Sequence, residues 1–151
     1  MQTRRDALRH GAVLAGLLAA SGLLAPRAQA AYNKAAFDAR SIQEAVRALG
    51  PGALVESRDV VLTAPDLSEN GAEVPLGVAT ALPGVRQLLL LVEKNPAALV
   101  AAFAVTDAVE ANVAIRAKMS QTSDVYGVAM MADGRVLYAR KNVKVTVGGC
   151  G

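Results

Sequence analysis

The sequence predicts a mainly β protein: an immunoglobulin-like, antiparallel β-sandwich of about seven strands with one N-terminal helix. Short runs rich in Val, Ile, Leu and Thr recur along the chain, turn residues separate them, and helical periodicity is confined to one early segment. The chain has one cysteine and no tryptophan. It therefore lacks the Cys-Trp-Cys core of a true immunoglobulin domain.

Residues 1–30 have the organisation of a twin-arginine signal peptide. Arg4 and Arg5 lie in a charged N-terminal region, an apolar stretch runs over residues 11–25, and Ala28-Gln29-Ala30 is a small-residue cleavage site. The stretch is shorter than the roughly 18 apolar residues that indicate a membrane-spanning helix. We therefore expect export by the twin-arginine route, removal of this leader and a periplasmic mature protein without a membrane segment.

Removing the leader also removes the net charge. The full sequence has 16 Lys and Arg against 13 Asp and Glu, and the leader holds four of the arginines and one aspartate, so 12 of each sign remain. Aromatic residues make up only 3% of the chain. A neutral chain with few aromatic side chains gives no support for nucleic-acid binding.

Ordinary catalytic and metal-binding motifs are missing as well. The only histidine, His10, belongs to the leader, so the mature chain lacks the usual general base and the commonest metal ligand. The segment that starts at Asp66 resembles the beginning of a calcium loop, but its twelfth position is Gly77, where a bidentate glutamate is needed. We interpret this segment as a turn, and expect neither a metal nor a cofactor.

Residues 31–147 are predicted to form one sandwich domain with an N-terminal helix. Ser41 and Glu44 form a capping box, and Gly50-Pro51-Gly52 ends the helix. Residues 33–39 can add an earlier helical turn. The apolar face of the helix contains Ile42, Val46 and Leu49.

Seven strand candidates follow the helix. Strict alternation marks the second candidate, and Asp133-Gly134 between two apolar runs predicts a hairpin turn. Pro75 and Gly77 place the second candidate near a sheet edge or at a bulge. The candidates span residues 55–63, 73–82, 85–92, 98–106, 111–119, 124–132 and 135–147.

Two strand features have more than one interpretation. Residues 88–92 are apolar on both faces, so this strand must be covered by the opposing sheet together with the helix, or by a partner. Methionines 119, 130 and 131 fit core positions. The basic residues near the C-terminus form a solvated strand face or a surface that meets an anionic substrate or acidic partner; they are Arg135, Arg140, Lys141 and Lys144.

Residues 148–151 are predicted to form a flexible arm that carries the only cysteine. Gly148, Gly149 and Gly151 surround Cys150, so no neighbouring side chain can hold the thiol in a core. Measured from Val147, an extended arm lets the thiol reach roughly 10 Å beyond the sheet. The terminal carboxylate lies one residue from the thiol and disfavours the thiolate, so we expect activation to come from the enzyme that receives the arm.

The chain resembles the SoxY family, the sulfur carriers of bacterial thiosulfate oxidation. The resemblance rests on the twin-arginine leader, the opening helix, residues 68–71, 93–96 and 133–134, and the ending Val143-Lys-Val-Thr-Val-Gly-Gly-Cys-Gly. It covers essentially the whole mature chain, and the ending is its most specific part. This sequence has one glycine fewer after the cysteine than the usual Gly-Gly-Cys-Gly-Gly ending of the family.

The resemblance implies a carrier that is not itself an enzyme, with no cofactor of its own. Cys150 would be the site of covalent sulfur attachment, and Gly148, Gly149 and Gly151 the arm. The implied partners are a SoxZ-like subunit in a heterodimer, a c-type cytochrome complex that attaches thiosulfate, a sulfate-releasing thiohydrolase and a sulfane dehydrogenase.

Two other hypotheses remain open from the residues alone. A secreted thiol-redox protein would need a stabilised thiolate and usually a resolving cysteine, neither of which is visible. An interaction module could instead form a disulfide-linked dimer through Cys150.

Overall fold

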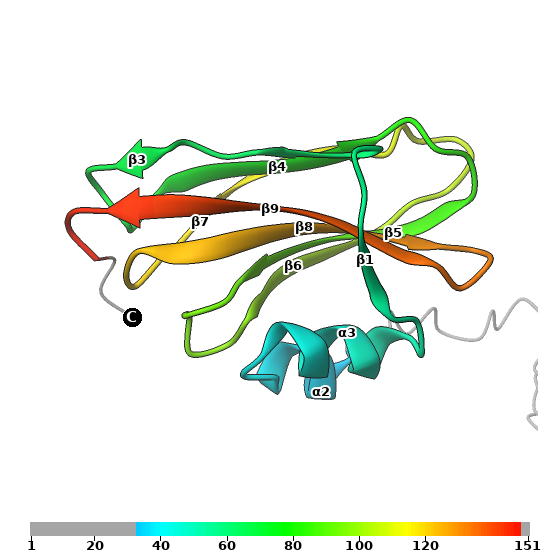
Figure 1. The fold of residues 1–151 in the computed structure, drawn as a ribbon, viewed down its shortest axis with the longest axis horizontal. Coiled ribbons are helices and arrows are strands. Elements are labelled where there is room, and N and C mark those ends of the chain that lie inside the picture. The colour runs from blue at the N-terminus through cyan, green and yellow to red at the C-terminus, as the bar shows by residue number, and fades with distance from the viewer. Residues whose placement is uncertain (1–32, 149–151) are drawn as a thin grey trace, which may run out of the picture. The chain divides into compact units, whose positions relative to one another are not determined.

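The computed structural model describes residues 33–148, which fold as a two-layer β-sandwich with two helices on one outer face (Figure 1). The larger sheet has the strand order β1-β9-β8-β5-β6, with β3 pairing with a further part of β9, and the smaller sheet has the order β2-β4-β7. The strands of the larger sheet are β1 (Leu54–Glu56), β3 (Leu67–Ser68), β5 (Val85–Val92), β6 (Leu99–Ala104), β8 (Ser123–Met131) and β9 (Val136–Val145). The smaller sheet contains β2 (Val60–Thr63), β4 (Val74–Thr80) and β7 (Asn112–Ala117).

The main core lies between the two sheets. Alternation in β4 puts Val74, Leu76 and Val78 at no more than 2% exposure, facing Leu88 and Leu90 of β5 across the sandwich. The predicted alternation of this strand is therefore confirmed. Pro75 lies where β4 pairs with β7 alone, because β2 reaches only to Gly77, so its missing N–H leaves no gap in the ladder.

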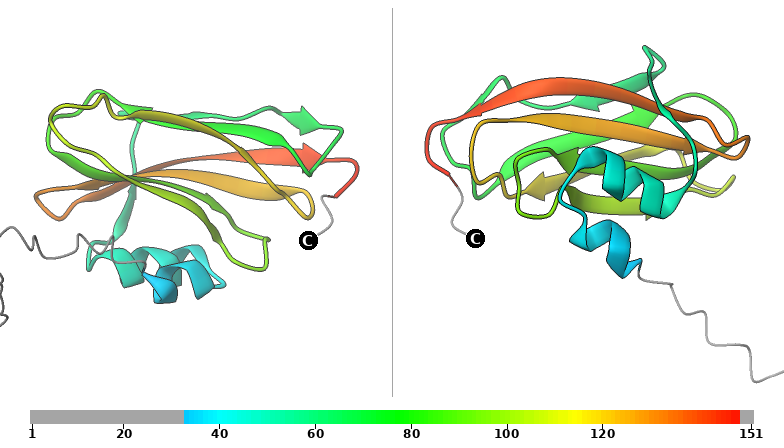
Figure 2. Two further views of the ribbon diagram at one scale, coloured as in Figure 1. Left: turned by 180° about the vertical axis from the view of Figure 1, so that it is seen from behind. Right: turned by 60° about the horizontal axis from the view of Figure 1, so that its bottom comes forward.

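Two helices cover the outer face of the larger sheet, as the second view in Figure 2 shows. In α3 (Ile42–Leu49) the hydroxyl of Ser41 accepts a hydrogen bond from the Glu44 N–H at 3.2 Å, as the predicted cap requires. The earlier turn predicted over residues 33–39 is a separate helix, α2 (Lys34–Asp38), and Asn33 caps it.

The apolar run of β5 is covered on both faces by this chain itself. Leu88, Leu90 and Val92 pack between the sheets, whereas Leu89 and Leu91 pack against the helices in a second apolar cluster. All five side chains are fully buried. Of the two interpretations of this run, the structure confirms the central strand between the opposing sheet and the helices.

The first strand candidate, residues 55–63, is wrong as a single strand. A turn at Ser57–Asp59, held by the Ser57 hydroxyl and the Asp59 N–H at 3.1 Å, divides it into β1 and β2. These two strands belong to different sheets, so this segment carries the chain from one layer to the other. Both β1 and β3 pair with β9 in parallel, so the larger sheet is mixed where we expected only antiparallel pairs.

The hairpin at Asp133-Gly134 forms as predicted. Gly134 has a φ of +90°, a left-handed conformation that favours glycine, and the Met131 N–H donates to the Arg135 carbonyl at 2.9 Å. Met119, Met130 and Met131 are buried, which confirms their core positions. No helix within residues 33–148 is long and apolar enough to cross a membrane.

The basic residues near the C-terminus lie largely at the surface, as a solvated strand face requires. Three of them have carboxylate partners, in the pairs Arg135–Asp133 at 2.7 Å, Arg140–Asp124 at 3.9 Å and Lys141–Asp66 at 2.9 Å. The Arg140 side chain also forms a hydrogen bond with Tyr126, and this contact raises the pKa of the guanidinium above its ordinary value. Burial raises the pKa of the Tyr126 phenol, whose ring lies 5.6 Å from that of Tyr138.

Candidate functional site

The predicted carrier arm begins where β9 leaves the sandwich, at the end of the molecule that contains β3 (Figure 1). The described residues extend along this segment as far as Gly148. Gly149, Cys150 and Gly151, all predicted to belong to the arm, lie outside them. What the structure gives is therefore the base of the arm and its surroundings.

One side of the arm base is held by residues 66–71. The Lys144 N–H donates to the Asp66 carbonyl at 3.0 Å, and the Thr146 N–H donates to the Ser68 carbonyl at 3.1 Å. The Gly71 N–H then donates to the carbonyl of Val147 at 2.8 Å. Backbone hydrogen bonds therefore continue past the last residue of β9 and hold the chain to within one residue of Gly148.

Residues 118–122 hold the other side. The Thr122 hydroxyl accepts from the Val145 N–H at 2.9 Å and lies 3.4 Å from the carbonyl of the same residue. At Gly148 the chain passes so close to Ser120 that a Cβ atom would overlap the Ser120 carbonyl oxygen. Glycine is therefore required at position 148 by this close approach, in addition to any flexibility it gives the arm.

The two holding segments are joined to each other. The Met119 N–H donates to the Gly71 carbonyl at 2.7 Å, and the N–H of Gly71 binds Val147. We call residues 66–71 and 118–122 the collar. Because Gly71 bonds both to the second segment and to the arm base, the collar and the end of β9 form one hydrogen-bonded unit.

Asn95 braces the collar from the β5–β6 connection. Its side-chain amide donates to the Lys118 carbonyl at 2.7 Å, and its amide oxygen accepts from the Ser120 N–H at 3.1 Å. Next to it, the Lys94 N–H donates to the Ser123 hydroxyl at 3.0 Å. These bonds fix the turn whose carbonyl faces Gly148, so Asn95 acts on the arm base through Ser120.

An ion pair supports the start of the collar. The Lys141 ammonium lies 2.9 Å from a carboxylate oxygen of Asp66 and donates to the Ala64 carbonyl at 2.7 Å. The hydrogen bond from Lys141 to the Asp66 carboxylate, together with the positive charge of Lys141, lowers the pKa of Asp66 below its ordinary value. The predicted turn at Asp66–Gly71 is thus tied to β9 by main-chain and side-chain bonds, and it includes the short strand β3.

The collar brings together segments that lie far apart in the sequence. Residues 68–71, residues 93–96 and the end of β9 carry much of the resemblance to the sulfur carriers, and they meet at the arm base. Sequence reasoning identified the cysteine and the turns, but not the roles of Ser120, Thr122 and Asn95. No local pattern shows that an asparagine bonds to residues 23 and 25 positions away.

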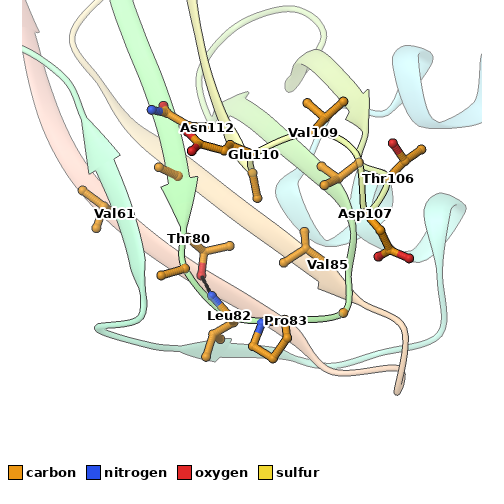
Figure 3. Close-up of a pocket in the computed structure, with 15 residues that line it drawn as sticks. Val61, Thr80, Leu82, Pro83, Val85, Thr106, Asp107, Val109, Glu110 and Asn112 are labelled. Carbon is orange, nitrogen blue, oxygen red and sulfur yellow. Dashed lines mark hydrogen bonds between the residues drawn. The ribbon is translucent and has the colours of Figure 1, made fainter.

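A hollow of about 650 Å³ is lined by residues of the β4–β5 and β6–β7 connections (Figure 3). These connections lie at the end of the sandwich opposite the arm base (Figure 1). The walls of the hollow combine apolar side chains, including Leu82, Pro83 and Val109, with Asp107 and Glu110. The Thr80 hydroxyl in its wall already accepts a hydrogen bond from the Leu82 N–H at 3.2 Å. Within residues 33–148, no three His, Cys, Asp or Glu side chains are grouped so that they could hold a metal ion.

A known protein family matches most of this sequence. The family model of the sulfur oxidation protein SoxY matches residues 45–150 of this sequence, a range that includes the cysteine. The chain belongs to the SoxY family. The family match supports a sulfur-carrier role, with Cys150 inside the matched region.

Solved structures show the same fold. The sulfur carrier protein SoxY from Chlorobium limicola f thiosulfatophilum is 31% identical with a TM-score of 0.64, over 71% of this chain and 97% of that one. The superoxide reductase (neelaredoxin) from Ignicoccus hospitalis matches with a TM-score of 0.52 at 18% identity, over 58% of this chain and 80% of that one. At this low identity the second likeness shows the fold alone. A search of curated proteins gave no match.

Proposed function

We propose that this SoxY protein is a periplasmic carrier that holds sulfur intermediates covalently on Cys150 and presents them to partner enzymes. The observation that carries the proposal is the position of the only cysteine, two residues beyond the point where the collar holds Gly148. A thiol placed there is attached to a rigid fold, and its neighbours in the sequence are glycines, which have no side chains to enclose it. This arrangement suits a group that must enter the active sites of other proteins.

The first carrier step joins the Cys150 thiol to thiosulfate. The Cys150 sulfur forms a bond to the outer sulfur of thiosulfate, giving Cys–S–S–SO₃⁻. The thiol proton leaves to solvent or to a base of the enzyme, and two electrons pass to an acceptor. We assign the acceptor role to the haems of a c-type cytochrome complex, the partner that the resemblance to the sulfur carriers implies.

The second step releases sulfate by hydrolysis. Water attacks the terminal sulfonate sulfur, the S–S bond to that sulfur breaks, and sulfate leaves with one proton. A persulfide, Cys–S–SH, remains on the arm. No change in electron count is needed, so a thiohydrolase suffices for this step, whereas oxidation of the remaining sulfane sulfur requires a sulfane dehydrogenase.

The contribution of this chain is positioning. The collar fixes where the arm leaves the sandwich, and the glycines keep its cross-section small. The glycines next to Cys150 in the sequence supply neither a base nor a cation, so deprotonation of the thiol is assigned to the receiving enzyme. A SoxZ-like subunit is the proposed partner in a heterodimer.

Reconstitution with the cytochrome complex and thiohydrolase tests the proposal. The wild-type chain with its partner subunit should support thiosulfate-dependent reduction of cytochrome and release of sulfate. Cys150→Ser should fold and pair with its partner normally but support neither reaction, because a hydroxyl cannot form the S–S bond. Equal turnover by the Cys150→Ser protein would exclude the carrier role.

Export is tested separately through the leader. Replacing Arg4 and Arg5 with lysine should leave both this chain and its signal-less partner in the cytoplasm, because the twin-arginine route moves folded cargo. Cell fractionation with antibodies to both chains measures this. Normal periplasmic amounts of both chains in the Arg4→Lys, Arg5→Lys double variant would contradict the proposed route.

A further inference from the structure

Exposed apolar side chains mark the base of the arm. Among the described residues, five large apolar side chains are exposed: Val55, Val61, Leu67, Val109 and Val147. Leu67 belongs to the collar, and Val147 is the residue that the collar binds immediately before Gly148. At 64% exposure, Val147 is the most exposed of the five. Single exposed apolar residues are common on protein surfaces, so its position must supply the argument.

The short reach of the arm makes that position important. Because Gly148 lies against Ser120, the first residue of the predicted arm is in contact with the fold. Cys150 is the second residue after Gly148, and a fully extended chain covers roughly 3.3–3.6 Å per residue. The Cα atom of Cys150 therefore reaches at most about 7 Å from that of Gly148.

An enzyme that reacts with this thiol must come equally close. Its reacting atoms must lie no further from Gly148 than about 7 Å plus the length of the cysteine side chain. A specific protein contact covers about 800 Å² on each partner, a patch much wider than this reach. The receiving enzyme must therefore cover the residues that surround Gly148, and Val147 is next to it in the chain.

We propose that the collar and Val147 form the docking surface for the sulfate-releasing thiohydrolase, with Val147 as its apolar contact. The inference rests on the proposed carrier function and adds the surface that this enzyme recognises. The complementary surface is an apolar lip around the channel that admits the arm. Leu67, 52% exposed, extends the apolar part of the surface along β3.

The test compares Val147→Ser with Val109→Ser in the complex with the partner subunit. Both valines are exposed, at 64% and 60%, but Val109 lines the hollow at the far end of the sandwich. Both substitutions replace one uncharged side chain with another, so neither changes the charge near the thiol. We expect Val147→Ser to raise the apparent KM of the thiohydrolase for the thiosulfate-loaded carrier about tenfold and Val109→Ser to leave it within twofold.

A second readout separates docking from the thiol itself. The rate of maleimide labelling of unloaded Cys150 should be the same in wild type and both variants, because a small reagent needs no docking surface. An unchanged KM for Val147→Ser, or a labelling rate that falls together with turnover, would overturn the inference. Failure of the carrier function looks different, since wild type itself would then accept no thiosulfate.

Discussion

The Ser120 carbonyl oxygen occupies the position where a Cβ atom of residue 148 would stand, so the collar accepts only glycine at the start of the arm without moving. Three sets of bonds lead to this contact: Asn95 holds Ser120, Thr122 holds Val145, and Gly71 holds Val147. The close approach to the Ser120 backbone is therefore a reason for glycine at position 148 that is separate from the flexibility predicted from the sequence for position 149.

Gly148→Ala is predicted to loosen the arm base, and Gly149→Ala is its matched control. An added methyl group at 148 must displace the Ser120 turn or the chain end, which weakens the bond between the Gly71 N–H and Val147. Hydrogen exchange of the Gly71 and Val145 amides should become faster in Gly148→Ala and stay unchanged in Gly149→Ala. Equal exchange in both variants would show that the close approach is not maintained.

Gly149→Pro tests flexibility beyond the collar. Proline fixes φ near −65° and biases Gly148 toward extended geometry, and position 149 follows the end of β9 at Val145. Turnover at each enzyme that admits the arm should fall, with thermal stability and maleimide labelling unchanged. Full thiosulfate-dependent turnover by Gly149→Pro would mean that the glycines serve some purpose other than flexibility.

Asn95→Ala is predicted to destabilise the protein by about 1 kcal/mol, the net value of a typical hydrogen bond, because two bonds to a partly solvated turn are replaced by water. Asn112→Ala is the control, since Asn112 is exposed at the far end of the sandwich. Urea unfolding measures both. An equal loss of stability in Asn112→Ala and Asn95→Ala would contradict the prediction.

Truncation of β5 tests its two buried faces. Leu90→Ala removes a side chain from the core between the sheets, and Leu91→Ala removes one from the core under the helices. Each should cost about 2–5 kcal/mol, as in other buried leucine truncations, while the exposed control Val55→Ala should change stability by less than about 0.5 kcal/mol. A negligible cost for Leu91→Ala alone would mean that the helices do not cover this face in solution.

Lys141→Met should raise the pKa of Asp66 toward its ordinary value of 3.8. Because the pKa of Asp66 is lowered in the folded protein, the ion pair stabilises the fold above that ordinary value and stops doing so as the pH falls through the lowered pKa. The part of the stability difference that comes from the ion pair should therefore vanish in acid, while the part from the bond between Lys141 and the Ala64 carbonyl remains. NMR titration of the Asp66 carboxyl measures the shift, and an unchanged pKa would contradict the ion pair.

Much of the sandwich could be predicted from the sequence, because alternation, turn residues and capping residues act locally. The alternation of apolar residues identifies the buried face of β4, with Val74, Leu76 and Val78 on it. Gly134 likewise identifies the turn in which it lies. The break at residues 57–59 was missed because both halves of the run favour strands, and only their separate partners, β9 and β4, divide them.

The candidate site was predictable only in part, for a related reason. Cys150 and its glycines form a local motif that the sequence displays openly. The collar consists of pairings between residues far apart in the sequence, such as Thr146 with Glu69, 77 positions away, and the fold alone creates them. The special role of Gly148 depends on such a pairing, with Ser120, and could not be separated from that of Gly149 by sequence.

The mass of the C-terminal peptide tests the central claim most directly. The protein, purified with its partner subunit, is incubated with the cytochrome complex with and without thiosulfate, and the peptide that contains Cys150 is then analysed under non-reducing conditions. The account predicts a thiosulfate-dependent increase equal to an S₂O₃ group less the thiol proton, located on Cys150 and lost on reduction. A peptide that stays unmodified, or is found only as a disulfide between two copies of the chain, would contradict the account.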